Sequence, residues 1–189
     1  MAKVAVILTN GFADWEYGFL AGAGGAFYGL EVRFFAPEAG ELTSIGGLNV
    51  KVSNSINDLA EWAPRTVAVI GGTIWETEVA PDISNVLNTH YESGGVVAGI
   101  CGGTLALARA GLLDKTAHTS NELKYLTEHA DSYSGADFFC ESSSAVPAER
   151  IITAPGTAPV SFTAAIFESV GLEQDVVQQF RSMLAAEHC

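Results

Sequence analysis

Positively charged residues are scarce in this sequence. It has 9 Lys and Arg residues against 22 Asp and Glu residues, which gives a formal net charge of −13 at pH 7. An acidic surface repels phosphate backbones and anionic lipid headgroups. We therefore expect no nucleic-acid partner and no membrane partner.

Long apolar runs are also missing, and no window approaches the roughly 20 residues of a membrane-spanning helix. The first apolar run, residues 4–8, passes directly into the polar turn of residues 9–11. It is too short for the core of a signal peptide, and no small-residue cleavage site follows it. We expect a cytoplasmic protein in which this run is the first strand.

Cysteine is infrequent as well. The three cysteines, Cys101, Cys140 and Cys189, are an odd number at wide spacings. They form neither a zinc-binding pattern nor a disulfide framework, so no metal site is expected. Free thiols suit a reducing compartment.

Short apolar runs alternate with segments of helical pattern, without repeats or charged linkers. This alternation predicts a doubly wound, three-layer α/β sandwich, flavodoxin-like, around a mainly parallel sheet. Residues 1–189 are expected to form a single domain. Buried strands are predicted at residues 4–8, 31–35, 67–70 and 96–100, and a further short strand at 115–119. Paired strands are predicted at residues 42–45 with 48–52, and at 142–146 with 150–154. Helices are predicted at residues 14–27, 81–91, 104–110, 121–128, 157–170 and 173–186, with Asp14 as an N-cap and Pro81 in a first turn.

One stretch combines a strand, a cysteine and a helix. The run of residues 96–100 ends at Cys101, two glycines follow, and residues 104–110 have a helical pattern. This is the order of a nucleophile elbow, which holds its nucleophile on a sharp turn between strand and helix. N–H groups at the helix start would favour the thiolate of Cys101. The alternative is a buried cysteine of the core, where free cysteine is common.

Further candidate residues follow the predicted strands. In a doubly wound sheet, ligands bind outside the carboxyl ends of the strands. Glu16, Gly71-Gly72 and Cys101 each follow one such strand end. The backbone N–H groups of Gly72 and Gly102 are natural donors to an oxyanion, because glycine lets a substrate approach the backbone.

Histidine is the usual proton handler for such a nucleophile. His118 follows the elbow helix, and a returning strand would bring it to the rim that holds Cys101. His90 lies late in a helix that ends far from that rim, where a surface or helix-capping role is the simpler interpretation. His129 is a further candidate, and His188, in the C-terminal tail, is a poor one.

The predicted helix of residues 14–27 carries Glu16. A carboxyl group buried near a sulfur would have a raised pKa, and its protonated form could donate a hydrogen bond to a thiolate. The residues alone favour an ordinary exposed glutamate in a first helical turn. The helix also contains glycines that permit close packing against either a dimer partner or the sheet: Gly18, Gly22, Gly24 and Gly25.

Five segments carry a family resemblance: GFADWEYG (11–18), VIGGT (69–73), AGICGGTLALARAGLLD (98–114), AHTSN (117–121) and TAPGTAPVSFTAAIFESVG (153–171). They resemble the ThiJ/PfpI superfamily, which has the class I glutamine-amidotransferase-like fold. The motif HTSN followed by ELKYL is most similar to a bacterial branch named intracellular protease/amidase.

The resemblance implies that Cys101 is the elbow nucleophile, Glu16 its carboxyl partner and His118 the histidine. It also implies that Gly72 and Gly102 match the oxyanion donors. Members of the family are usually homodimers without a cofactor, so we expect a homodimer that acts on a small-molecule substrate and binds no cofactor.

The chain departs from the protease-like branch at one position. That branch has a histidine directly after the nucleophilic cysteine, and this chain has Gly102 there. The resemblance therefore does not carry over that peptidase arrangement. No separate acid that orients His118 is evident, although Asp114 is near it in sequence.

Three hypotheses of function follow. The first is a cysteine-dependent hydrolase or lyase, of amidase or glyoxalase III/deglycase type, that acts on a small carbonyl or amide through the Cys101 thiolate. The second is an oxidation-sensing stress protein or chaperone in which Cys101 is oxidised to a sulfenic or sulfinic acid. The third is a non-catalytic interaction module that keeps the elbow as architecture; a thiol pKa near about 8.5 would favour it.

Overall fold

The computed structural model describes residues 1–186, and a seven-stranded sheet forms its centre. The strands are β1 (Lys3–Ile7), β2 (Glu31–Ala36), β5 (Asn54–Ser55), β6 (Thr66–Val69), β7 (Val96–Ile100), β8 (Val146–Ala148) and β9 (Ile151–Ala154). Their order is β5-β2-β1-β6-β7-β9-β8, and all neighbours are parallel except β8 and β9. A separate hairpin pairs β3 (Gly40–Thr43) with β4 (Asn49–Val52).

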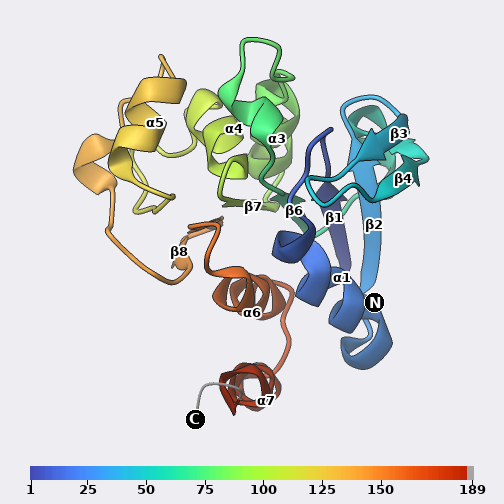
Figure 1. The fold of residues 1–189 in the computed structure, drawn as a ribbon. Coiled ribbons are helices and arrows are strands. Elements are labelled where there is room, and N and C mark those ends of the chain that lie inside the picture. Colours follow the sequence, from blue (N-terminus) through green and yellow to red (C-terminus); the bar gives the residue numbers. More distant parts are fainter. Residues whose placement is uncertain (187–189) are drawn as a thin grey trace.

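Helices cover both faces of this sheet (Figure 1). One face carries α1 (Asp14–Tyr28), α6 (Pro159–Ser169) and, outermost, α7 (Gln174–Ala185). The other carries α2 (Leu59–Trp62), α3 (Ser84–Glu92) and α4 (Gly103–Arg109), with α5 (Leu123–His129) beyond α4. Short 3₁₀ turns are η1 (Ile56–Asp58), η2 (Thr73–Glu76) and η3 (Ala136–Phe138). The predicted three-layer sandwich with a mainly parallel sheet is confirmed.

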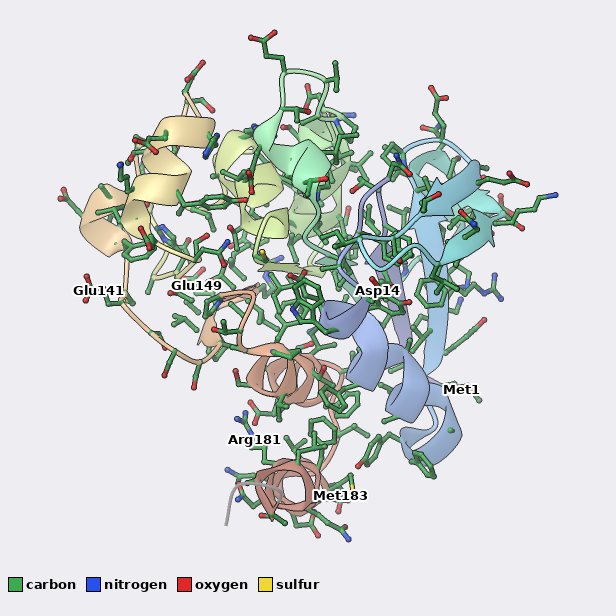
Figure 2. All side chains as sticks on the ribbon, viewed as in Figure 1. Met1, Asp14, Glu141, Glu149, Arg181 and Met183 are labelled. Atoms are coloured by element: carbon green, nitrogen blue, oxygen red, sulfur yellow. The ribbon has the colours of Figure 1, made fainter. Side chains whose placement is uncertain are left out.

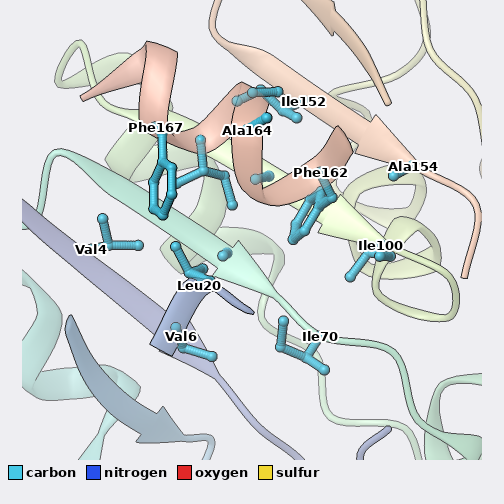
Figure 3. Packing of buried hydrophobic residues seen from close by; sticks show 14 of the residues in the cluster. Val4, Val6, Leu20, Ile70, Ile100, Ile152, Ala154, Phe162, Ala164 and Phe167 are labelled. Atoms are coloured by element: carbon cyan, nitrogen blue, oxygen red, sulfur yellow. The ribbon is translucent and has the colours of Figure 1, made fainter. Parts of the chain in front are cut away.

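The continuous apolar strands result from burial on both faces. In β1, Val4 and Val6 belong to the core beneath α1 and α6, part of which Figure 3 shows, whereas Ala5 and Ile7 belong to the core on the opposite face. Alternate side chains of a strand point to opposite faces, so a strand covered on both sides is apolar at most of its positions.

The carboxyl ends of the central strands meet at one rim. Ile7 pairs with Val69, and Val69 pairs with Gly99. The residues that follow β1, β6 and β7 therefore come together, as the sequence predicts. This rim includes the turn that contains Cys101.

Some predicted elements are wrong at their ends. Ala13, not Asp14, is the N-cap of α1. Asp14 Oδ2 instead accepts the Gly46 N–H (2.8 Å), which ties the start of α1 to the β3–β4 loop (Figure 2). The helix predicted at 81–91 begins only at Ser84, because Asp82 Oδ1 accepts the Ser84 N–H in a turn before it. Residues 54–62 contain β5, η1 and α2, which the sequence analysis missed.

Two predicted strands are also wrong. Residues 115–119 form no strand, because His118 makes only an isolated bridge to Phe139. Residues 142–145 form no strand, because the Ser144 N–H donates to Ser142 Oγ in a turn, and β8 starts only at Val146. Strand β8 includes Pro147, which an edge strand tolerates because its missing N–H can face away from the sheet. The antiparallel pairing with β9 is confirmed.

Within residues 1–186, no helix combines the length and apolar character needed to cross a membrane. Two residues weighed in the sequence analysis, His188 and Cys189, lie outside the described residues.

Helix α4 packs very closely on the sheet because of two glycines. A Cβ on Gly103 would lie 2.2 Å from the Val69 carbonyl oxygen, and one on Gly99 would lie 2.9 Å from Leu107 Cδ1 and 3.1 Å from the Gly103 carbonyl oxygen. Backbone atoms cannot move away as a flexible side chain can. Close contact of α4 with β6 and β7 therefore depends on glycine at these positions.

We predict that Gly103→Ala lowers the free energy of unfolding by about 3 kcal/mol, the upper part of the usual range for overpacking. Chemical denaturation monitored by circular dichroism measures the change. Gly40→Ala is the matched control, because a Cβ on Gly40 in β3 meets no atom within 4 Å. Equal stability of the two variants would contradict the packing argument.

Candidate active site

Cys101 has the backbone conformation of a nucleophile elbow. Its φ is +54°, in the left-handed region that side chains rarely adopt. Such a residue costs on the order of 1–3 kcal/mol and persists only where its surroundings hold it. The Cys101 N–H donates to the Ala154 carbonyl (2.9 Å), and the Cys101 carbonyl accepts from the N–H (3.1 Å) and the hydroxyl (2.6 Å) of Thr104. These bonds fix the turn between β7 and α4.

The carboxyl group of Glu16 is buried beside this cysteine. Glu16 is 0% exposed, so the interpretation as an exposed glutamate is wrong. Its Oε2 accepts the Gly71 N–H at 2.7 Å, whereas Oε1 has no partner of ordinary hydrogen-bond geometry among the described residues. A Cβ on Gly156 would lie 2.9 Å from Cys101 Sγ and 3.3 Å from Glu16 Oε1. The unpaired oxygen and the sulfur therefore border the same small space.

Burial controls the protonation of both groups. It raises the pKa of Glu16 from 4.5 to about 7, against the opposing effect of the Gly71 hydrogen bond. Ionising Glu16 in the folded protein is thus unfavourable, and this group lowers stability as the pH rises from about 4.5 through about 7.

The pKa of Cys101 is raised to about 11, first by burial and then by the negative charge of Glu16. Hydrogen bonds from Asn121 and the Gly102 N–H act in the opposite direction. We expected the start of the helix to lower the pKa of Cys101. While Glu16 is ionised, the pKa of Cys101 is raised instead. Protonation of Glu16 removes its charge, and its O–H can then donate to the sulfur.

Asn121 is a site residue that the sequence analysis missed. Its Nδ2 donates to Cys101 Sγ at 3.3 Å, and its Oδ1 accepts the Gly156 N–H at 2.9 Å. The Gly156 carbonyl in turn accepts the Trp15 indole N–H at 2.9 Å. The sequence did contain a signal, because Asn121 is the last residue of the AHTSN motif in which only His118 was predicted as a site residue.

The two predicted oxyanion donors lie side by side. A Cβ on Gly102 would be 3.2 Å from the Gly72 nitrogen and 3.0 Å from its oxygen. The Gly102 N–H also hydrogen-bonds to the Cys101 sulfur. A side chain at position 102 would therefore be in tight contact with the Gly72 backbone.

In the part of the chain that the structure describes, His118 makes no hydrogen bond to Cys101. His118 is 0% exposed, with Nδ1 at 2.7 Å from the Thr116 carbonyl and Nε2 at 2.7 Å from the Tyr133 hydroxyl. A carbonyl can only accept, so Nδ1 carries the proton and Nε2 of the neutral ring accepts from Tyr133. Burial lowers the pKa of His118, which keeps the ring neutral.

The other candidate residues, Asp114, His90 and His129, make contacts away from Cys101. Asp114 accepts the Ser134 N–H at 3.0 Å, and its charge favours protonation of His118 without a direct hydrogen bond between them. His90 Nε2 lies 3.2 Å from the Val96 carbonyl, at the opposite edge of the sheet. The His129 carbonyl accepts from Arg109 at 2.8 Å.

A cavity of about 360 Å³ is lined by Asn121, whose Nδ2 bonds to the Cys101 sulfur, and its other walls include Ser120, Leu123 and Phe139. Its size suits a small molecule. Nearby, the Tyr125 hydroxyl donates to Glu76 Oε1 at 3.0 Å, and the negative charges of Cys101 and Glu16 contribute to the raised pKa of Tyr125. Among residues 1–186, no three His, Cys, Asp or Glu side chains form a group that could hold a metal ion.

Comparison with known proteins gives consistent matches. The pattern of the DJ-1/PfpI family matches residues 2–169. Uncharacterized protease YdeA of Bacillus subtilis is 30% identical, over 92% of this chain and 85% of its own, and uncharacterized protease YoaZ of the same organism is 29% identical, over 89% and 83%. The crystal structure of DJ-1 superfamily protein Atu0886 from Agrobacterium tumefaciens is 32% identical and covers 100% of both chains, with a TM-score of 0.93.

We predict that Glu16→Gln lowers the pKa of the Cys101 thiol, because the substitution removes a buried negative charge beside the sulfur. Asn121→Ala should raise the same pKa, because it removes a donor to the thiolate. The pH dependence of iodoacetamide labelling at Cys101, followed by mass spectrometry, measures both effects. Shifts in the same direction would contradict the assigned roles.

Proposed function

This chain belongs to the DJ-1/PfpI family, and from that premise we propose that it is a cysteine-dependent hydrolase or lyase that acts on a small carbonyl or amide. The observation that carries the proposal is the pairing of the strained Cys101 turn with the buried carboxyl group of Glu16. A charge buried at this position costs stability, which a purely architectural turn would not require.

The pair can supply the first chemical step. The thiol proton passes to the Glu16 carboxylate as the Cys101 sulfur forms a bond to the substrate carbonyl carbon. The carbonyl π electrons move to the oxygen, and the N–H groups of Gly72 and Gly102 stabilise the resulting oxyanion. A pKa of about 7 allows Glu16 to hold this proton and return it near neutral pH.

The later steps depend on the substrate class. From an amide, the amine leaves with the proton returned by Glu16, and water hydrolyses the thioester to regenerate the thiol. From a dicarbonyl, the proton returned to the oxyanion completes a hemithioacetal. Asn121 keeps the sulfur in position through both routes, since it bonds to Cys101 and to Gly156.

A small substrate is favoured over a polypeptide. The cavity beside Asn121 measures about 360 Å³, and the sulfur lies beneath Gly156, whose carbonyl is tied to Trp15. Position 102 holds glycine, so the histidine of the protease-like branch is absent from this site. Free thiols at Cys101 and Cys140 support a reducing compartment such as the cytoplasm as the place of action.

Oxidation sensing is the second candidate. The Cys101 sulfur already receives hydrogen bonds from Asn121 and from the Gly102 N–H, and the oxygens of a sulfenic or sulfinic acid would accept from the same donors. The raised pKa of Cys101 opposes this role while Glu16 is ionised.

We also propose a homodimer that forms through α1. Gly24 packs against Val32, but a Cβ on Gly18 or Gly22 would meet no atom within 4 Å, and Trp15 is 49% exposed. These outward positions follow one another at helical spacing. A second copy of the same helix could approach this surface closely.

We predict that Cys101→Ser abolishes turnover of glyoxal-type and small amide substrates without unfolding the protein. Loss of a nucleophile of this kind removes the covalent route altogether. Steady-state assays on a substrate panel, with circular dichroism as the fold check, measure the effect. Cys140→Ser is the control and should keep full activity; full activity in Cys101→Ser would contradict the proposal.

For the second candidate, mild peroxide should add oxygen to Cys101 before Cys140 or Cys189. Intact mass with peptide mapping identifies the order of modification. Asn121→Ala should slow oxidation at Cys101, because the product loses a hydrogen-bond donor. Modification of all three cysteines at equal rates would count against oxidation sensing.

For the dimer, Gly22→Lys should convert a dimer into a folded monomer, because the new side chain enters open space on the monomer. Sedimentation velocity measures the oligomeric state. Gln178→Lys, at an exposed position of α7, is the matched control. A wild-type monomer, or a Gly22→Lys dimer, would contradict this interface.

A further inference from the structure

A second, larger groove lies at the opposite edge of the sheet from Cys101. It has a volume of about 490 Å³ and runs between α2 and α3, with Arg65 and Gly94-Gly95 at its inner end. Arg65 immediately precedes β6, and Gly95 immediately precedes β7. Strand β7 therefore separates this groove from Cys101 by about 20 Å. The proposed reaction uses none of its residues.

The groove is positively charged although the protein is strongly acidic. None of its 14 lining residues is Asp or Glu, in a chain with 22 acidic residues and 9 Lys and Arg residues. Arg65 and His90 are its titratable residues. The charges that act on the His90 ring come from Arg65 and Arg150, and both are positive.

The Arg65 guanidinium has N–H donors that are available to a ligand. One of them, on Nη1, bonds to the Gly94 carbonyl at 3.0 Å. No carboxylate within residues 1–186 forms an ion pair with Arg65. Since a guanidinium carries five N–H donors in a planar fork, it can hold a carboxylate through two parallel bonds.

The rest of the groove divides into polar and apolar parts. The polar side chains of Asn85, Thr89 and Ser93 come from α3 and the turn after it, and Ile56, Leu59 and Val86 supply apolar surface. A ligand that fits both parts needs an anionic head and an apolar body. One guanidinium matches one negative charge, which favours a carboxylate over a phosphate dianion.

We propose that this groove binds a small carboxylic acid with an aliphatic chain, its carboxylate on Arg65 and its chain against Ile56, Leu59 and Val86. The ligand is distinct from the substrate of Cys101. Binding at this edge therefore does not require the thiol.

Sodium hexanoate is the probe, titrated into the ¹⁵N-labelled protein while its amide resonances are recorded. The Gly94 and Gly95 resonances should move to saturation, and the Gly102 resonance should stay in place. Arg65→Met should weaken hexanoate binding by about tenfold or more, the effect of losing a hydrogen bond between charged groups. Cys101→Ser should leave it unchanged.

Arg181→Met is the matched control, because Arg181 pairs with Glu168 on the far helices α6 and α7 (Figure 2). Asn85→Asp is a second test that keeps Arg65 and adds a negative charge to the groove; it should also weaken binding. The proposal is overturned if hexanoate does not saturate the Gly94 and Gly95 resonances. It is also overturned if a folded Arg65→Met variant or Asn85→Asp binds as tightly as the wild type, or if acetate or inorganic phosphate binds as tightly as hexanoate.

Discussion

The burial of the Glu16 carboxyl group beside the Cys101 sulfur is the constraint on which the rest of the site depends. The negative charge of an ionised Glu16 raises the pKa of the Cys101 thiol, so the ionisation of one group opposes the ionisation of the other. The Gly71 N–H holds one carboxyl oxygen and leaves the other for the sulfur. The first turn of α1 must therefore reach the end of β6 as well as the elbow. The proposed chemistry uses this arrangement, in which removing the proton from one group protonates the other.

The close packing of Glu16 against Cys101 leaves little space for other side chains, and glycine at the neighbouring positions makes it possible. Side chains at Gly71 or Gly156 would collide with both Glu16 and Cys101, and one at Gly102 would be in tight contact with Gly72. The segments that contain Gly71, Gly102 and Gly156 thus come close to the sulfur, and each presents backbone atoms to it instead of a side chain. In the proposed reaction, the polar side chains beside the sulfur are therefore the carboxyl group of Glu16 and the amide of Asn121, rather than an imidazole.

The periodicity of the sequence was sufficient to predict the layers, the parallel strands and the rim, because strands buried on both faces leave continuous apolar runs. It was insufficient where tertiary contacts override local pattern. Asp14 caps a loop instead of its own helix, Pro147 lies inside an edge strand, and the segment around His118 folds back as a single bridge. Glu16 and Asn121 show the same limit within the site. Their burial and their orientation depend on segments far away in the chain, which no local spacing encodes.

The hydrogen bonds that hold the sulfur do not end at Asn121. They continue through Gly156 to the indole of Trp15, which is half exposed, whereas Trp62 and Trp75 are buried. The Trp15 indole is thus a native fluorophore that is linked by hydrogen bonds to the Cys101 sulfur. Because it is half exposed, its emission can be distinguished from that of the two buried indoles at the red edge of the spectrum. Events at the thiol can therefore be followed optically in the unlabelled protein, in real time.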